Sequence, residues 1–195
     1  MVTDAQTPNT DQLVRAAKAA EKTGRLPPIH LWNPPFCGDI DMEIRRDGTW
    51  FHEGTPIGRP ALVRLFSTIL KREGARYFLV TPAEKVGIRV EDAPFVAQDL
   101  EVTGKGRSQI VTFVTNVGDR VPAGPDCAIR VEHDASGAPR PYVHVRAGLE
   151  ALIDRKSFYR LVDLGQTGPE AEQGWFGLWS SGVFFPFLPL DELAP

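Results

Sequence analysis

The sequence predicts an α+β protein of two similar β-hairpin–helix–strand units, with a β-rich middle and C-terminal part. Residues 39–45 alternate between polar and apolar side chains and are soon followed by the turn signal Asp47-Gly48. Residues 59–74 then carry apolar side chains at helical spacing. A looser copy of this arrangement follows, because its turn glycine, Gly137, lies 89 positions after Gly48 (137 − 48).

The first hairpin is predicted to turn at Asp47-Gly48 with a two-residue loop, since both residue types tolerate the positive φ angles of a type I′ turn. This register pairs Ile44 with Phe51 on an apolar face. It also pairs Glu43 with His52 on the opposite face. That polar face is predicted to carry Asp41, Glu43, Arg45, Trp50 and His52.

A helix is predicted over residues 59–74. Pro60 suits a first helical turn, and Gly74 can take the left-handed conformation after a last turn. The apolar stripe of this helix comprises Leu62, Val63, Leu65, Phe66, Ile69 and Leu70. A short buried strand is predicted next, at residues 77–80.

The second unit repeats these elements in the same order. A hairpin turns at Ser136-Gly137, and a helix begins near Arg155, where Arg155-x4-Arg160-Leu161 repeats Arg59-x4-Arg64-Leu65. Residues 175–179 then occupy the place of the buried strand. Three matched elements in one order favour an internal duplication.

These observations divide the chain into three parts. Residues 1–26 are an N-terminal tail with a short helix, residues 27–92 are the first α+β unit, and residues 93–195 are a β-rich second unit that contains the copy. Asp154 lies beside Arg155 and is able to cap the second helix.

Composition narrows the function classes. The 195 residues carry a net charge of −3 with a pI near 5.8, which argues against nucleic acid or acidic membranes as partners. Two cysteines are too few for a disulfide scaffold. No apolar run approaches the ~20 residues of a membrane-spanning helix. The sequence therefore predicts a cytoplasmic protein.

Several runs of the first half resemble a bacterial family described only as a domain of unknown function, DUF1285. They are residues 37–42 (CGDIDM), 47–52 (DGTWFH), 56–57 (PI), 62–66 (LVRLF), 79–85 (LVTPAEK) and 90–95 (VEDAPF). The resemblance spans most of the chain and implies an α+β fold of two similar halves. It implies no established activity, a role in signalling having only been suggested, and no catalytic residues can be transferred.

Arg59 is the most unusual candidate for a site. It stands at a helix N-cap, where Ser, Thr, Asp or Asn is preferred, and a cation there opposes the helix dipole. Either a small anionic ligand lies between Arg59 and the helix, or Arg59 reaches a carboxylate among Glu84, Glu91 and Asp92. The predicted ligand site comprises Trp50, His52, Arg59, Glu84 and Lys85.

This site makes a non-catalytic ligand-binding or regulatory module the leading hypothesis. Two other hypotheses compete with it. Carboxylates and an imidazole can hold a divalent metal, so a metal-dependent hydrolase would use Asp39, Asp41, Glu43 and His52. The same residues also suit a solvated hairpin face. A dimeric interaction scaffold would instead expose the aromatic residues 175–187, which otherwise form core.

No G-x-S-x-G, P-loop or C-x-x-C motif occurs, so the sequence leans away from an enzyme and names no cofactor.

Overall fold

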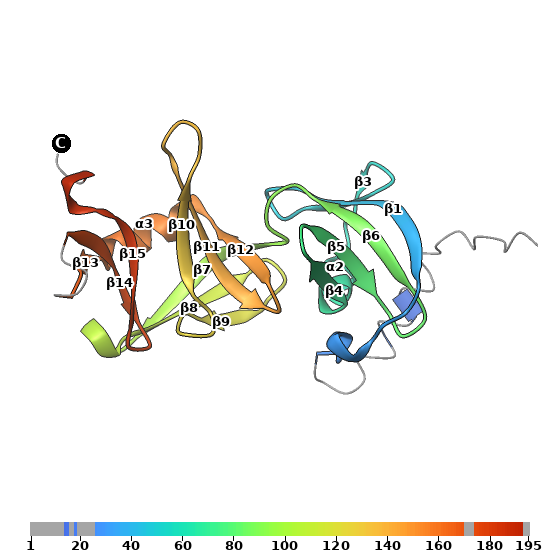
Figure 1. Cartoon of the computed structure of the whole chain (residues 1–195), viewed down its shortest axis with the longest axis horizontal. Coiled ribbons are helices and arrows are strands. Elements are labelled where there is room, and N and C mark those ends of the chain that lie inside the picture. The colour runs from blue at the N-terminus through green and yellow to red at the C-terminus, as the bar shows by residue number, and fades with distance from the viewer. Residues whose placement is uncertain (1–13, 16–17, 19–25, 170–173, 193–195) are drawn as a thin grey trace, which may run out of the picture. The chain divides into compact units, whose positions relative to one another are not determined.

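The computed structural model describes residues 14–15, 18, 26–169 and 174–192. Contacts between Cα atoms divide the chain into two compact units, residues 1–94 (unit 1) and residues 95–195 (unit 2). Each unit has a six-stranded sheet and an α-helix beside it (Figure 1). The N-terminal helix expected within residues 1–26 falls largely outside the described residues. Within the described part of the chain, every helix is too short or too polar to span a bilayer.

Unit 1 is a mixed sheet, called sheet A, with a helix inserted between its two halves. A 3-10 turn, η1 (Ile29–Leu31), precedes the sheet, and the elements that follow are β1 (Phe36–Ile44), β2 (Trp50–His52), β3 (Thr55–Pro56), α2 (Pro60–Thr68), β4 (Leu70–Glu73), β5 (Arg76–Val80) and β6 (Lys85–Val90). The strand order is β3-β2-β1-β6-β5-β4. Neighbouring strands are antiparallel, except that β1 and β6 run parallel.

The core of unit 1 lies between one face of sheet A and α2. Trp50 of β2 stacks on Phe66 of α2, with ring centroids 6.2 Å apart, and both side chains are buried. The helix also buries Leu65 beside Phe66, as its apolar stripe predicted. The sheet supplies Met42, Ile44, Leu70, Leu79, Val86 and Ile88 to this core.

The predicted register of the first hairpin is wrong by one residue. The structure pairs Ile44 with Trp50 and Glu43 with Phe51, and the amide of Arg45 donates to the carbonyl of Thr49. The loop therefore has three residues, with Gly48 at φ 82° in the left-handed position typical of that loop. A slip of one residue exchanges the two faces of a strand.

Trp50 is therefore in the core, where the two-residue loop had placed Phe51. The guanidinium of Arg45 lies over the ring of Phe51, 3.7 Å from its centroid, and not over Trp50 as the predicted register implied. His52 is opposite Met42. His52 and Glu43 consequently lie on opposite faces of the hairpin.

The predicted helix over residues 59–74 is also too long. It ends at Thr68. Leu70 then begins β4, which pairs with β5 so that Leu70 lies opposite Leu79. The hydroxyls of Ser67 and Thr68 donate to the carbonyls three residues earlier in the chain, which competes with helical bonding. Gly74 closes the β4–β5 hairpin instead of a helix, with φ 60°.

Unit 2 has a six-stranded sheet, called sheet B, and a three-stranded sheet, called sheet C. Its elements are β7 (Phe95–Thr103), η2 (Gly106–Ser108), β8 (Ile110–Thr115), β9 (Arg120–Pro122), β10 (Ile129–His133), β11 (Pro139–Arg146), β12 (Leu149–Ile153), α3 (Arg155–Asp163), β13 (Gln166–Thr167), β14 (Trp175–Ser180), β15 (Val183–Pro189) and η4 (Leu190–Glu192). Sheet B has the order β10-β11-β12-β7-β8-β9, and sheet C the order β13-β14-β15.

The core of unit 2 lies along one face of sheet B. Ile129, Val143, Ala151 and Phe95 stand opposite one another on four adjacent strands, and all are buried. Helix α3 contacts β7 and β14, while β15 contacts β10. Phe158 of α3 packs against Phe187 of β15, with ring centroids 5.8 Å apart, and Phe184, Phe185 and Phe187 of the C-terminal aromatic run are core.

The two six-stranded sheets share one topology, which is consistent with two similar units. Each sheet consists of two three-stranded meanders. The first strand of the first meander runs parallel to the last strand of the second, so β1 is parallel to β6 and β7 is parallel to β12. The helix differs in place, because α2 joins the meanders of unit 1 whereas α3 follows both meanders of unit 2. The hairpin β1–β2 therefore corresponds to β7–β8, and not to β10–β11 as the sequence match assumed.

Candidate functional site

The carboxylates of β1 lie on the face of sheet A opposite the core, where arginines bind them. Asp39 accepts a hydrogen bond from the guanidinium of Arg76 at 2.6 Å, and Asp41 accepts one from Arg89 at 2.8 Å. Arg89 also lies near Glu43, and the hydrogen bond to Asp41, together with both negative charges, raises the pKa of its guanidinium. These side chains form an ion-pair ladder across β1, β5 and β6.

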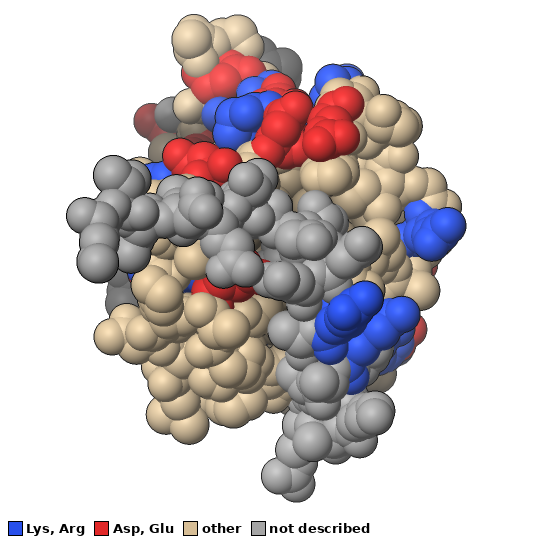
Figure 2. Space-filling view, turned by 90° about the vertical axis from the view of Figure 1, so that its right-hand side faces the viewer, with Lys and Arg blue, Asp and Glu red and all other residues tan. Residues whose placement is uncertain are grey.

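Gly87 makes room for this ladder. It lies opposite Asp39 on the neighbouring strand, and a Cβ atom there would stand only 1.9 Å from the Oδ1 of Asp39. Shallow hollows of about 260 and 340 Å³ flank Arg76 and Arg89. Acidic and basic side chains lie next to one another on the side of the molecule seen in Figure 2, so this side has no field of a single sign.

The four residues predicted to bind a metal do not converge. Asp39 and Asp41 are paired with arginines, and His52 lies on the face opposite Glu43. Among the described residues there is no group of three or more His, Cys, Asp or Glu side chains able to hold a metal ion.

Two residues of the predicted ligand site contact other groups. Trp50 is buried against Phe66, and Lys85 donates to Glu73 at 2.9 Å. The Oγ1 of Thr81 accepts a hydrogen bond from the amide of Glu84, which closes that turn, and burial raises the pKa of the Glu84 carboxyl.

Arg59 is the N-cap residue of α2, as predicted, and its side chain is exposed. Its carbonyl accepts hydrogen bonds from the amides of Leu62 and Val63. Two of the three carboxylates expected to bind it have other partners: Glu91 accepts from the amide of Arg46, and Asp92 forms an ion pair with the Arg46 guanidinium at 3.5 Å.

A larger pocket lies in unit 2, between β10 and sheet C. It has a volume of about 690 Å³ and is lined by Ile129, Arg130, Val131, His133, Gly137, Trp175, Pro186, Phe187 and Pro189. Trp175 is 40% exposed, whereas Phe187 is buried. The pocket thus has an apolar and aromatic wall, with Arg130 and His133 along the strand at its side.

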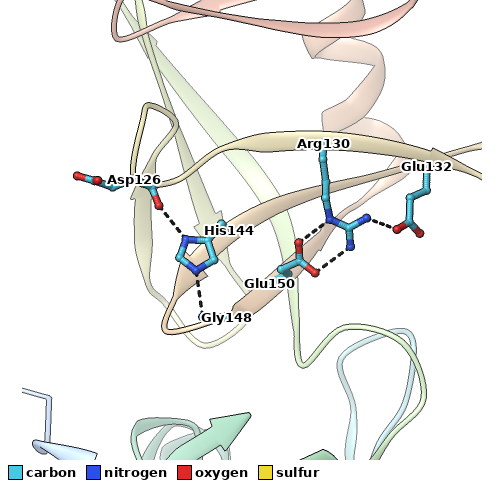
Figure 3. Close-up of polar contacts among 6 residues, drawn as sticks. All are labelled: Asp126, Arg130, Glu132, His144, Gly148 and Glu150. Carbon is cyan, nitrogen blue, oxygen red and sulfur yellow. Dashed lines mark hydrogen bonds and ion pairs between the residues drawn. The ribbon is translucent and has the colours of Figure 1, made fainter. Parts of the chain in front are cut away.

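Arg130 is fixed by two carboxylates (Figure 3). Its Nε and Nη2 donate to the two oxygens of Glu150 at 2.6 and 2.8 Å, and its Nη1 pairs with Glu132. The hydrogen bonds to Glu150, with the charges of both carboxylates, hold the pKa of Arg130 above its ordinary value. The guanidinium also lies 4.3 Å from the centroid of Tyr142. This geometry orients Arg130 rigidly.

His144 is held beside this cluster by two backbone groups (Figure 3). The amide of Gly148 donates to its Nε2 at 3.1 Å, so its Nδ1 carries the proton and donates to the carbonyl of Asp126 at 2.8 Å. Ala147 and Gly148, with φ of 47° and 75°, form the tight turn that brings this amide to the ring. His144 therefore fastens the β11–β12 turn to the segment before β10.

Comparison with known proteins identifies the family. Residues 27–93 match the family described as "Domain of unknown function (DUF1285), N-terminal domain", and residues 94–187 match "Protein of unknown function (DUF1285), C-terminal domain". This chain belongs to the DUF1285 family. No curated protein matches it.

Two crystal structures of DUF1285 proteins resemble the chain. The first, from Silicibacter pomeroyi DSS-3, is 65% identical with a TM-score of 0.85, over 93% of this chain and 97% of that one. The second, from Shewanella baltica OS155, is 28% identical with a TM-score of 0.51, over 63% of this chain and 90% of that one. The resemblance read from the sequence is therefore confirmed.

Sequence reasoning missed the pocket of unit 2. Arg130 and His133 lie in a predicted hairpin, and Trp175 lies in a predicted strand, but no motif joins segments more than 40 residues apart. The available signal was an excess of aromatic residues at 175–187, which predicted either core or an interaction surface. Both occur, since Phe185 and Phe187 are buried and Trp175 is partly exposed.

Proposed function

We propose that this DUF1285 protein is a non-catalytic ligand-binding or regulatory module, and that its ligand occupies the pocket between β10 and sheet C. The observation that carries the proposal is the make-up of this pocket. Ligand pockets typically enclose ~300–1,000 Å³ and combine an apolar wall with a few fixed polar groups. A volume of about 690 Å³, the wall of Trp175 and Phe187, and the oriented Arg130 fit that description.

The charges around the pocket support binding more than proton transfer. Arg130 is neutralised by Glu132 and Glu150, so it offers fixed geometry and not a free positive charge. A ligand with an apolar body would pack against Trp175 and Phe187. A strongly anionic ligand would gain little here, because the cluster of one arginine and two carboxylates is net negative.

A small anion at Arg59 is a second candidate. Its support is that the side chain is exposed beside the N-terminus of α2, and that no ion pair holds it among the described residues. This candidate rests on Arg59 without Trp50, which is buried, or Lys85, which is paired with Glu73. Titration with inorganic phosphate tests it, because Arg59→Ala would abolish a stabilisation that the parent shows.

A homodimer and a cytoplasmic location stay predictions. Trp175, Tyr159 and Phe36 are large exposed apolar side chains that a dimer interface would use. Sedimentation at several protein concentrations measures the oligomeric state.

A fragment screen by ¹⁹F NMR, using small fluorinated aromatic and aliphatic compounds, tests the pocket. We expect binders whose affinity falls by about tenfold or more in Trp175→Ala, since an aromatic anchor typically supplies over ~1 kcal/mol. Tyr159→Ala is the matched control, because Tyr159 is 53% exposed and lies outside the pocket. Binders that Trp175→Ala does not weaken, or a screen without binders, would contradict the proposal.

A further inference from the structure

Strand β10 lies at one edge of sheet B, beside the pocket, and no other strand in the described part of the chain pairs with its outer side. Its ladder with β11 shows which backbone groups face outward. The amide of His144 donates to the carbonyl of Ala128, and the amide of Asp134 donates to the carbonyl of Ala138. In an antiparallel pair the residues that bond to the partner strand alternate. Residues 130 and 132 therefore also bond to β11, and residues 129, 131 and 133 turn their amides and carbonyls to the free edge.

The three residues whose backbone groups face outward line the pocket, as does Arg130 between them. Ile129, Val131 and His133 share one face of β10, the face on which Val143 and Ala151 continue the core. Sheet C lies beside them, since β15 contacts β10 and places Phe187 and Pro186 along the pocket (Figure 1). An open row of backbone donors and acceptors therefore borders an apolar cavity.

The other sheet edges in the described part of the chain are protected in ways that β10 is not. β3 and β13 have two residues each, and β9 has three and ends in Pro122. β4 carries Lys71, Arg72 and Glu73, and β15 contains Pro186 and Pro189. Short strands, charges and prolines prevent pairing at an edge. β10 has five residues and no proline, and its two charged residues bond to β11.

We propose that an extended peptide adds to β10 as a further strand of sheet B, with apolar side chains at alternate positions. This inference rests on the proposed function, because it names the class of ligand for the same pocket. Main-chain hydrogen bonds to residues 129, 131 and 133 supply affinity, and alternate side chains enter the space beside Trp175 and Phe187. The intervening side chains of the peptide face the side of Arg130 and Glu132 and are polar.

The direct test uses a capped heptapeptide in which valine and threonine alternate. Fluorescence anisotropy of a labelled copy gives its affinity for the full chain. Two further peptides carry N-methyl groups on one or the other alternate set of backbone nitrogens. A strand added to a free edge bonds on one side only, so we expect one methylated peptide to lose binding and the other to keep it. Equal binding by both, or equal loss in both, would overturn the proposal.

His133→Pro tests the strand edge from the protein side. The amide of residue 133 faces outward, so proline removes a donor to the peptide without breaking the β10–β11 ladder. We expect peptide binding to weaken about three- to tenfold, as for the loss of one hydrogen bond. His133→Ala is the matched control, because it removes the same imidazole and keeps the amide.

The outcomes separate this inference from the proposed function. Fragments that bind in a Trp175-dependent way while no peptide binds would leave the pocket assignment intact and refute the added strand. Failure of both fragments and peptides refutes both. If the unmodified protein is a dimer that His133→Pro dissociates, a second copy of the chain pairs with the edge of β10. That result would also overturn the peptide proposal.

Discussion

Units 1 and 2 use the same six-strand topology and finish it differently. In unit 1, α2 follows the first meander and packs on sheet A through Phe66 and Trp50, while the opposite face carries the ion-pair ladder of Asp39 and Asp41. In unit 2, α3 follows the second meander and leads into sheet C, whose strand β15 lies beside β10. The pocket of about 690 Å³ occurs in the unit with the added sheet.

This difference indicates that the position of the helix in the chain determines which element packs beside each six-stranded sheet. A helix between the meanders covers the core face with residues from the middle of the unit. A helix after both meanders carries the chain past the sheet, so a further sheet can form beside the edge strand β10. The ladder of unit 1 keeps one face of sheet A polar, whereas the added sheet of unit 2 borders the pocket that we propose as a ligand site.

The largest loss of stability that would distinguish unit 1 from unit 2 is expected from Phe66→Ala. Phe66 is fully buried and stacks on Trp50, so its removal leaves a cavity and costs about 3–5 kcal/mol of unfolding free energy. Phe158→Ala in unit 2 should cost less, nearer the lower end of that range, because Phe158 keeps 8% exposure. Urea unfolding measures both values.

Hydrogen exchange assigns each loss to a unit. Phe66→Ala should lower protection in β1, β2 and β5 and leave β11 and β12 unchanged. Phe36→Ala is the control, since Phe36 is 49% exposed and its truncation should cost under ~1 kcal/mol. A uniform loss of protection in both units would mean that they unfold as one body and would contradict the comparison.

The next largest change in unfolding free energy is expected at the helix N-caps. Asp154 caps α3, accepting a hydrogen bond from the amide of Ser157 at 2.7 Å, so Asp154→Ala should cost about 1 kcal/mol. Arg59 makes no side-chain cap on α2, so Arg59→Ala should be nearly neutral and Arg59→Ser should stabilise by up to ~1 kcal/mol.

Urea unfolding of the three variants measures these values. Asp154→Asn is the matched control, because an amide oxygen keeps the cap. A clear loss of stability in Arg59→Ala would show that the arginine binds a group at the helix start, which would favour the anion candidate.

Much of the fold could be predicted because its signals are local. The strand at residues 77–80 follows from a short apolar run, and the structure confirms it within β5. The register of the first hairpin could not be predicted, since Asp47-Gly48 suits a two-residue and a three-residue loop alike. The choice between the loops buries either Trp50 or Phe51, and the helix that packs on Trp50 decides it.

The candidate site was harder to predict because no local pattern encodes it. The alternation at Asp39, Asp41 and Glu43 indicated a polar face correctly, but the arginines that bind it come from β5 and β6. The pocket depends on β15 lying beside β10, more than 50 residues apart in sequence. Arg59 could be predicted as a candidate site residue because an arginine at a helix N-cap is unusual, and that observation depends on a single position.

The smallest expected effect compares the three-residue loops of the β1–β2 and β10–β11 hairpins by the titration of one carboxylate in each. The carboxylate of Asp134 accepts hydrogen bonds from the hydroxyl and amide of Ser136 and from the amide of Ala138, and these lower its pKa. The carboxylate of Asp47 accepts from the amide of Thr49, and this bond is the main cause that lowers its pKa.

A lowered native pKa stabilises the folded state above the ordinary value of about 3.9, and this contribution disappears as the pH falls through the native pKa. Carbon-13 NMR titration of the carboxyl groups should therefore find both below the ordinary value. Ser136→Ala removes the largest cause at Asp134 and should raise that pKa toward the ordinary value, leaving Asp47 unchanged. If Ser136→Ala does not move the titration of Asp134, the hydroxyl does not bind the carboxylate, and only backbone amides donate to it.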